Sequence, residues 1–446
     1  MHSPSRLRPA LAALLWLCLA AGLMPGFATP AQAQLNLRIG PGGAFQPMPI
    51  AIADFSGDPS LGPTLSGIVT NNLKRSGYFT PVEKGRFPES PNFDAAPNFS
   101  AWKDIGVQGL VTGRVTRDGT GKLKAEFRLW DVLSGQQMVG QQYAGDGANA
   151  RRMGHLISDA VYTKITGIGG FFDTRVAFVD ESGSKEHRRK RLAIMDQDGA
   201  NVRYLTSGEA SVVAPRYSPS TQDITYMAQV TGQQPRVQVI NLSTGARQVI
   251  PTNAEMSTSP RFSPDGRRLV MSDQDGGNAS IYVMDLASKA QTRITNANAI
   301  DTSPSFSPDG REIVFESDRG GQQQVYVMGA DGSNPRRLTF GDGSASQPAW
   351  SPRGDYIAFT RQRKGSFAIC VMKPDGTGER VLTEGFHNEG PTWAPNGQYL
   401  IFFRDPGGQA GGKLYMVDIT GKVEQPVPTP SYASDPTWSP LIDPQR

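Results

Sequence analysis

The chain has 446 residues, of which 45 are basic and 41 acidic, so its formal net charge is only +4. This balance lacks the clear basic excess that a nucleic-acid-binding protein would show, and it excludes that class of function. The length exceeds that of a usual single domain, which predicts at least two domains.

Residues 1–33 have the pattern of a secretory signal peptide. Arg6 and Arg8 precede an apolar run from Ala10 to Leu23, and Ala31-Gln32-Ala33 follows as a small-residue cleavage site. The apolar run is too short to span a bilayer comfortably. Cys18 lies in the middle of this run and lacks the small residues that precede a lipid-modified cysteine. We therefore predict an exported protein without direct membrane insertion.

Export would leave a nearly neutral chain with one thiol. Removing residues 1–33 takes away two arginines and no acid, which leaves 43 basic and 41 acidic side chains. Of the two cysteines only Cys370 remains, so an oxidising compartment adds no internal disulfide and stability must come from core burial. Cys370 lies in the apolar run Ala368–Met372, which indicates an inert core thiol.

Residues 34–44 are predicted to form a separate N-terminal segment. Its first part, Gln34-Leu35-Asn36-Leu37-Arg38-Ile39, alternates apolar and polar residues like a strand, and Gly40-Pro41-Gly42-Gly43 follows as a hinge. Two interpretations stay open. The segment is either a frayed end or edge strand of its own domain, or a detachable strand that adds to a partner's sheet.

Residues 45–168 have the pattern of a small α/β domain. Strand-like alternation or apolar runs occur at 48–52, 110–115, 123–129 and 137–143, and helical spacing occurs at 65–73 and 153–165. His155 lies among apolar positions of the last helix, which favours a packing or surface role over a ligand role. The domain contains no glycine-rich phosphate loop and no recognisable catalytic pattern.

Residues 169–446 carry a repeated phrase, Pro-x-aromatic-(Ser/Ala)-Pro, often continued by Asp-Gly. Its second proline falls at positions 219, 264, 308, 352, 395 and 440, which are 43 to 45 residues apart. Proline cannot donate to a sheet and Asp-Gly supplies turn geometry, so each phrase marks a hairpin corner between short strands. A period of this length with four strands per unit predicts a β-propeller.

The repeat starts and ends out of phase. Arg175–Val179 matches the strand that follows the turn, and only two further strands complete that first unit. The last unit, Asp435–Pro440, supplies one strand and stops. Together the two fragments make one blade, so that the ring closes without free edges. We predict an α+β two-domain protein, in which the small α/β domain precedes a six-bladed β-propeller closed by strands from both ends.

No pattern in the chain indicates catalysis or a dedicated metal site. The mature chain has three histidines, His155, His187 and His387, and none is spaced with cysteine or carboxylates as a zinc site. Acidic turns such as Asp196–Gly199 resemble calcium loops only faintly, because strands flank them. We therefore expect a binding module that is not an enzyme and has no cofactor. A calcium or sodium ion in the central channel, and a hydrolase or small-ligand sensor function, stay open as alternatives.

The order of these parts resembles the TolB family of the Tol–Pal system, over essentially the whole exported chain. Phrases such as Ile281–Ser288 and Lys164–Ile168 carry the resemblance, whereas the repeat alone is also similar to propellers of prolyl-oligopeptidase relatives. The resemblance implies a periplasmic, non-enzymatic protein, which we expect to be a monomer. It would bind the lipoprotein Pal with its propeller and TolA with Gln34–Ile39, and so maintain outer-membrane integrity and constriction during cell division.

Residues just before each innermost strand should gather at one mouth of the propeller channel. They are small, polar and varied between blades, as a ring of binding contacts requires. The candidate Pal contacts are Met256, Thr258, Asp301, Thr302, Gln347, Phe386, His387 and Asn388. Phe386 and His387 are the expected anchors. The family's histidine belongs to the second propeller repeat, where this chain has Met256, while Thr302 keeps the family's threonine.

Overall fold

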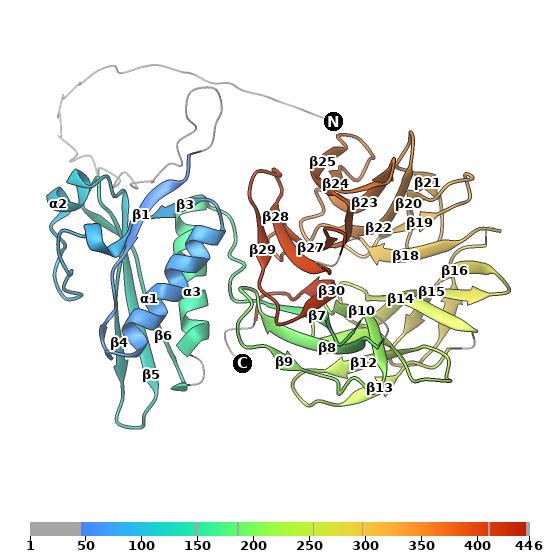
Figure 1. Cartoon of the computed structure of the whole chain (residues 1–446), viewed down its shortest axis with the longest axis horizontal. Helices are drawn as coiled ribbons and strands as arrows, with labels where there is room; N and C mark the ends of the chain where they lie inside the picture. The colour runs from blue at the N-terminus through green and yellow to red at the C-terminus, as the bar shows by residue number, and fades with distance from the viewer. Residues whose placement is uncertain are drawn as a thin grey trace, which may run out of the picture.

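The computed structural model describes residues 46–442, apart from 148–149, 185–186, 253, 297 and 409–410. The predicted signal peptide and the segment Gln34–Ile39 lie outside the described residues. The described chain forms a small α/β domain beside a larger propeller (Figure 1).

The first domain is a mixed sheet in the order β3-β1-β4-β5-β6. Its strands are β1 (Met48–Ile52), β3 (Phe79–Pro81), β4 (Gly109–Arg117), β5 (Leu123–Asp131) and β6 (Gln136–Gly145), and the short β2 (Ser56–Gly57) pairs with β4. Strand β1 runs parallel to both β3 and β4. The pairs β4–β5 and β5–β6 on the other side of the sheet are antiparallel.

Helices cover this sheet because its strands alternate apolar side chains between two faces. Helices α1 (Leu61–Arg75) and α3 (Ala150–Thr166) pack in the core that contains Ile50 and Ile52. The short α2 (Phe99–Asp104) places Trp102 against Ala51 in a second, smaller core. The two long helices approach closely at Gly154, where an added Cβ would lie 2.9 Å from Ile68 Cγ2.

The propeller consists of six four-stranded antiparallel sheets in the described part of the chain. Within each blade the strands are given from the channel outward, and the first two blades are β10 (Ser211–Tyr217), β11 (Asp223–Gln229), β12 (Arg236–Asn241), β13 (Arg247–Val249), and β14 (Met256–Phe262), β15 (Arg268–Asp275), β16 (Asn278–Asp285), β17 (Gln291–Arg293). The next two are β18 (Asp301–Phe306), β19 (Glu312–Ser317), β20 (Gln324–Gly329), β21 (Arg336–Arg337), and β22 (Ser344–Trp350), β23 (Ile357–Arg363), β24 (Ser366–Met372), β25 (Arg380–Gly385). The last two are β26 (His387–Trp393), β27 (Tyr399–Asp405), β28 (Lys413–Asp418), β29 (Glu424–Val427), and β30 (Tyr432–Trp438), β7 (Arg175–Ser182), β8 (Arg189–Asp196), β9 (Arg203–Tyr204).

The last of these blades confirms the predicted closure by both ends of the propeller. Strand β30 pairs with β7, with Trp438 opposite Val176, and Ser439 N donates to Arg175 O at 2.9 Å. The indole of Trp438 donates to Thr174 Oγ1 at 2.8 Å. The sixth blade is therefore completed by a strand from the other end of the propeller.

The innermost strands begin earlier than the sequence indicated. The candidate contacts were expected just before these strands, but the structure places most of them inside β14, β18, β22 and β26. The reason is a β-bulge in every innermost strand. At the residue before the proline, the pairing of the innermost strand with the next strand of its blade shifts register. The bulge residues share a positive φ and are Ala214, Ser259, Ser303, Gln347, Gly390 and Asp435.

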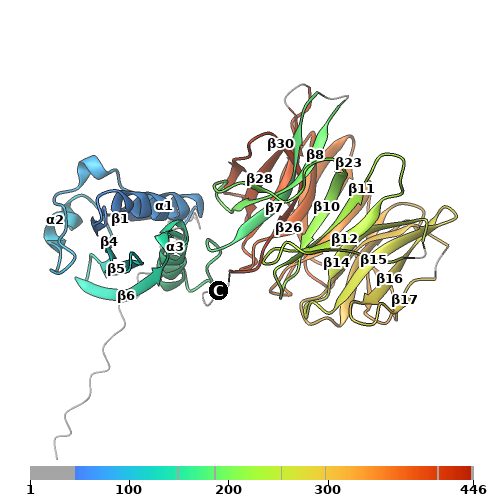
Figure 2. The ribbon, with the colours of Figure 1, turned by 90° about the horizontal axis from the view of Figure 1, so that it is seen from below.

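The two domains share one continuous core. Phe171 and Phe172, at the start of the propeller, pack on Tyr162 of α3 with ring centroids 5.7 Å apart. Phe171 also packs on Tyr399 of β27 at 4.4 Å. The Tyr399 hydroxyl donates to the Ser76 carbonyl at 2.8 Å, which caps the end of α1. The small domain is thereby fixed to one side of the propeller, as Figure 2 shows.

Candidate functional site

The central channel has two ends of different composition. We call the end at which the innermost strands begin the N-mouth, and the end at which they finish, in the Pro-x-aromatic phrases, the Pro-mouth. Asn396 and Tyr399 follow the fifth of the six phrases and contact Gly169 and Ser76, which precede the propeller strands. The small domain therefore lies on the Pro-mouth side, and the N-mouth faces away from it.

Two of the eight candidate contacts at the N-mouth are fully buried. Asp301 accepts two hydrogen bonds from Arg319 Nη2, at 2.9 and 3.0 Å. The Asn388 amide oxygen accepts one from Arg404 Nε at 2.9 Å. These side chains hold neighbouring strands in place and do not reach solvent. Their polar character in the sequence gave no sign of this burial.

His387 is half-buried between two aromatic rings. Its ring lies 4.7 Å from Phe367 and 5.5 Å from Phe403, measured between ring centroids. Its Nε2 lies 3.3 Å from a carboxylate oxygen of Glu389. Its free side faces a cavity of about 270 Å³ between the last two blades, which Ser434 and others line.

Thr302 and Gln347 belong to a hydrogen-bond chain across three consecutive blades. The Thr302 hydroxyl donates to one oxygen of Glu316, and the other oxygen accepts the backbone N–H of Gln347 at 2.6 Å. The Gln347 side-chain oxygen accepts the N–H of Gly390 at 2.8 Å. Glu316 is buried. Burial raises the pKa of its carboxyl group, and the hydrogen bonds from Thr302 and Gln347 oppose this shift.

Met256 and Thr258 are half-buried on β14.

Three large apolar side chains are exposed where the chain leads into three consecutive innermost strands. Ile300 precedes β18, Phe340 lies in the loop before β22, and Phe386 precedes β26. Their exposed fractions are 42%, 64% and 65%. We call these residues the apolar row. Sequence reasoning found only Phe386, although Phe340 stands out in the sequence as an aromatic residue followed by Gly341-Asp342-Gly343.

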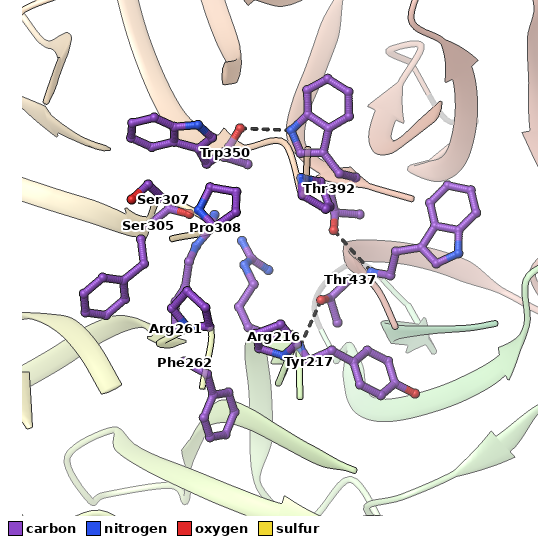
Figure 3. A pocket seen from close by; sticks show the side chains of 17 residues that line it. Arg216, Tyr217, Arg261, Phe262, Ser305, Ser307, Pro308, Trp350, Thr392 and Thr437 are labelled. Atoms are coloured by element: carbon purple, nitrogen blue, oxygen red, sulfur yellow. Dashed lines mark hydrogen bonds between the residues drawn. The ribbon is translucent and has the colours of Figure 1, made fainter. Parts of the chain in front are cut away.

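The Pro-mouth contains a cavity of about 390 Å³ that residues of all six blades line (Figure 3). Its walls carry the Pro-x-aromatic phrases, whose aromatic side chains are mostly buried between blades. The middle position of the phrase differs between blades, and it is arginine in two of them, Arg216 and Arg261. Sequence reasoning treated the phrase as a fixed structural element and missed these arginines.

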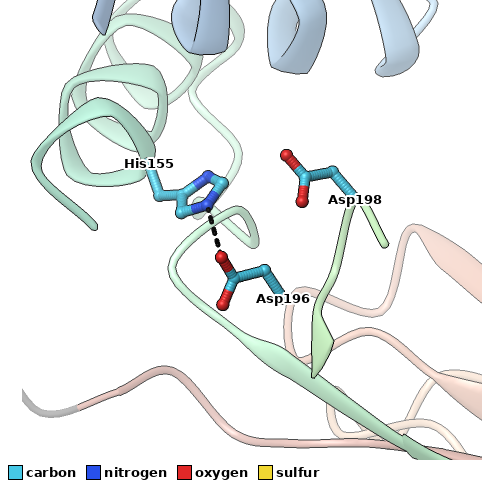
Figure 4. A group of neighbouring side chains, drawn as sticks. All are labelled: His155, Asp196 and Asp198. Atoms are coloured by element: carbon cyan, nitrogen blue, oxygen red, sulfur yellow. Dashed lines mark ion pairs between the residues drawn. The ribbon is translucent and has the colours of Figure 1, made fainter. Parts of the chain in front are cut away.

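Three side chains of kinds that commonly bind metal ions lie close together between the domains (Figure 4). They are His155, Asp196 and Asp198. Their donor atoms lie within 4.8 Å of one another. Arg151 already pairs with both carboxylates, and its Nε lies 2.9 Å from Asp196 Oδ2. His155 Nδ1 lies 2.9 Å from the amide nitrogen of Asn72. Because a guanidinium occupies the carboxylates, this group joins α3 to the propeller rather than forming a metal centre.

The comparisons with known proteins agree with this architecture. Residues 162–442 match the family model described as TolB beta propeller domain, and residues 35–138 match the model described as TolB amino-terminal domain. None of the helices in the described residues is long and apolar enough to cross a membrane.

Two solved structures are similar to the chain over different extents. The crystal structure of TolB from Acinetobacter baumannii is 30% identical, with a TM-score of 0.80, and the match covers 89% of this chain and 97% of that one. The structure of putative TolB from Agrobacterium tumefaciens is 21% identical, with a TM-score of 0.45, over 55% of this chain and 98% of that one.

Proposed function

Since the chain belongs to the TolB family, we propose that it acts in the periplasm as a binding scaffold of the Tol–Pal system. In this proposal the N-mouth of the propeller binds Pal, and residues 34–39 bind TolA. The protein performs no catalysis, and its role is to connect partners that maintain the outer membrane and its constriction at cell division.

The apolar row is the observation that carries the Pal proposal. Exposed aromatic side chains on one face, surrounded by polar residues, are typical of protein interfaces. Ile300, Phe340 and Phe386 belong to neighbouring blades, so one partner surface can cover them together. The half-buried Thr302 and His387 lie on β18 and β26, the strands that follow Ile300 and Phe386, and would complete the contact. The row faces away from the small domain, which leaves that domain accessible while Pal is bound.

The test is the affinity of purified Pal for variants of the apolar row. Phe340→Ala and Phe386→Ala should each weaken binding about tenfold or more, because truncation of an interface aromatic commonly costs 2 kcal/mol or more. Leu133→Ala is the matched control, because Leu133 is a 50%-exposed apolar residue of the small domain. Circular dichroism should be unchanged in all three. Wild-type affinity in both phenylalanine variants would place the Pal site elsewhere.

The TolA proposal is tested by deleting residues 34–39. Such a short alternating segment can add as a strand to a partner's sheet, with main-chain hydrogen bonds supplying affinity. The deletion should abolish TolA capture and leave Pal binding intact. If both partners bind in the full chain, any effect of Pal on TolA affinity must equal the effect of TolA on Pal affinity. Unchanged TolA capture after the deletion contradicts this part of the proposal.

A further inference from the structure

The Pro-mouth cavity has a composition that the proposed scaffold function does not use. Arg216 and Arg261 come from adjacent blades, β10–β13 and β14–β17, and both side chains point toward the middle of the ring (Figure 3). The corresponding positions of the other four blades are small or carry a hydroxyl. They are Ser305, Ala349, Thr392 and Thr437. One side of the cavity is therefore cationic, and the remaining blades contribute short side chains at this position.

Neither guanidinium group forms an ion pair with a carboxylate of the described residues. The Arg261 side chain makes no hydrogen bond with any residue that the structure describes. Arg216 donates only to its neighbouring carbonyl, Pro215 O, at 2.7 Å. Arginine has five N–H donors and stays protonated in proteins, so most of this donor capacity is unused.

The hydroxyl groups of the other blades add further donors. Thr392 Oγ1 accepts the N–H of Trp438 at 3.2 Å, and Thr437 Oγ1 accepts the N–H of Tyr217 at 3.1 Å. Each threonine hydroxyl therefore keeps its own proton free to donate. Ser305 is buried on β18, next to the blade of Arg261. The cavity thus presents an excess of donors over acceptors.

Two carboxylates near the cavity act on the arginines without forming an ion pair with them. Burial, and then the positive charge of Arg216, lower the pKa of Arg261, and the Glu316 carboxylate opposes this shift. Glu316 already accepts the N–H of Gln347, and it lies toward the N-mouth. Asp435 partly offsets the burial of Arg216. The two guanidinium groups repel each other, and an anion bound between them would relieve this repulsion.

We propose that the Pro-mouth cavity binds a small tetrahedral oxyanion of the phosphate class between Arg216 and Arg261, either free phosphate or a phosphate monoester. Arginine pairs with phosphate oxygens through parallel, charge-assisted hydrogen bonds. A tetrahedral anion offers oxygens in several directions, so it can bond both arginines and the surrounding hydroxyl groups at once. A planar carboxylate held by the arginines leaves those hydroxyl groups unused. The positive charge also disfavours a calcium or sodium ion at this end.

The experiment is titration calorimetry of the full chain with inorganic phosphate, with sodium chloride at equal ionic strength and sodium acetate as comparison salts. Phosphate should bind saturably, and Arg261→Gln should weaken it about tenfold or more, because a hydrogen bond to a charged group contributes roughly 1.5–3 kcal/mol. Arg267→Gln, an exposed arginine of the same blade, is the control and should bind like the wild type. Tighter binding of glycerol 3-phosphate than of phosphate would assign the site to a monoester, and equal binding to the free ion.

Thermal unfolding separates this site from a structural role of the arginines. Without phosphate, Arg261→Gln should be at least as stable as the wild type, because it removes repulsion from Arg216. Phosphate should raise the Tm of the wild type and of Arg267→Gln, but not that of Arg261→Gln. Arg216→Gln should behave like Arg261→Gln. Equal effects of phosphate and chloride on the wild type, tighter binding of acetate, or an undiminished phosphate effect in both cavity variants would overturn the proposal.

Discussion

The bulge residues of the innermost strands are the most constrained residues of the propeller. Five of the six have a side chain although their φ lies between 49° and 52°, a left-handed conformation that disfavours L-residues. Some of these side chains offset the strain by bonding the next blade. Gln347, for example, accepts the N–H of Gly390, and its own N–H is bound by Glu316. The bulge at Gln347 therefore connects three neighbouring blades.

A reciprocal pair of substitutions tests this strain. Gly390 has a φ of 65°, and an added Cβ would meet no atom within 4 Å. Gly390→Ala should therefore lower the free energy of unfolding by about 1 kcal/mol through backbone strain alone. Ala214→Gly, at the equivalent position of another blade, should raise it by up to about 1 kcal/mol. Urea unfolding of both variants measures the difference. Changes of the same sign would contradict the strain argument.

Asp159 of α3 gives the folded protein a titration near neutral pH. Burial, with a smaller contribution from the charge of Asp173, raises the pKa of Asp159 to about 6 from an ordinary 3.8. Its carboxylate accepts the N–H groups of Phe172 and Asp173, at 2.8 and 2.9 Å, which opposes the shift without cancelling it. Asp173 itself pairs with Arg152. The folded state therefore takes up a proton at a higher pH than the unfolded chain.

The stabilising effect of this protonation should be lost as pH rises. It is fully present below the ordinary pKa of 3.8 and disappears through about pH 6, because the folded state binds more protons than the unfolded state in that interval. Asp159→Asn should remove this part of the pH dependence, measured as the free energy of unfolding between pH 4 and 7. Asp104→Asn, on the exposed end of α2, is the control. An unchanged slope in Asp159→Asn would contradict the prediction.

Single residues show where sequence reasoning failed. The six bulges repeat in space, but their residues are alanine, serine, serine, glutamine, glycine and aspartate, so only Gly390 signals a positive φ. The bulge also changes which side chains face the channel. For this reason Arg216 and Arg261 reach the cavity although they belong to a phrase that the sequence marks as structural. Asp301 and Asn388 were assigned to the surface because nothing in the sequence marks their half-buried arginine partners, which lie 18 and 16 residues away.

At the scale of elements, strand β30 holds the propeller closed. It supplies the innermost strand of the blade that β7, β8 and β9 complete. Trp438 of this strand is buried, and its ring packs on Phe171 with centroids 5.9 Å apart. Removing the strand would expose the edge of β7 and the core of the domain interface together.

Two variants of different severity test how far β30 stabilises the propeller. Truncation before Tyr432 should abolish cooperative unfolding of the propeller and promote aggregation through the exposed edge. Trp438→Ala keeps the strand but removes a buried aromatic side chain, so it should lower the free energy of unfolding by about 3–5 kcal/mol. Circular dichroism melts and light scattering measure both. A truncated chain with the wild-type Tm would show that β30 is dispensable.

Elements were predicted more reliably than sites because they depend on periodic patterns. The spacing of the Ser-Pro corners indicated six blades, and the out-of-phase fragments at both ends indicated the closure that β30 and β7 make. The starts of the innermost strands were placed too late, since proline was taken as their beginning. In the structure a bulge allows the strand to continue through that proline.

At the scale of the whole molecule, the two domains are joined by polar bonds as well as by a shared core. Gln197, in the turn after β8, is almost fully buried. Its side-chain nitrogen donates to Asn72 Oδ1 at 3.0 Å, and its oxygen accepts from Arg75 Nη1 at 3.0 Å. Burial lowers the pKa of Arg75, and the charge of Asp198 opposes this shift. One side chain of the propeller thus satisfies two polar residues at the end of α1.

This arrangement predicts how the domains unfold. The wild type should show a single calorimetric transition, because the aromatic core and these bonds couple the domains. Gln197→Ala leaves the amide of Asn72 and the guanidinium of Arg75 without this partner, which should cost about 1–3 kcal/mol. The loss falls on the interface alone, so the small domain and the propeller should then unfold in two separate transitions. Gln233→Ala, in an exposed loop of the propeller, should keep the wild-type profile. Two transitions in the wild type, or one unshifted transition in Gln197→Ala, would mean that the interface does not couple the domains.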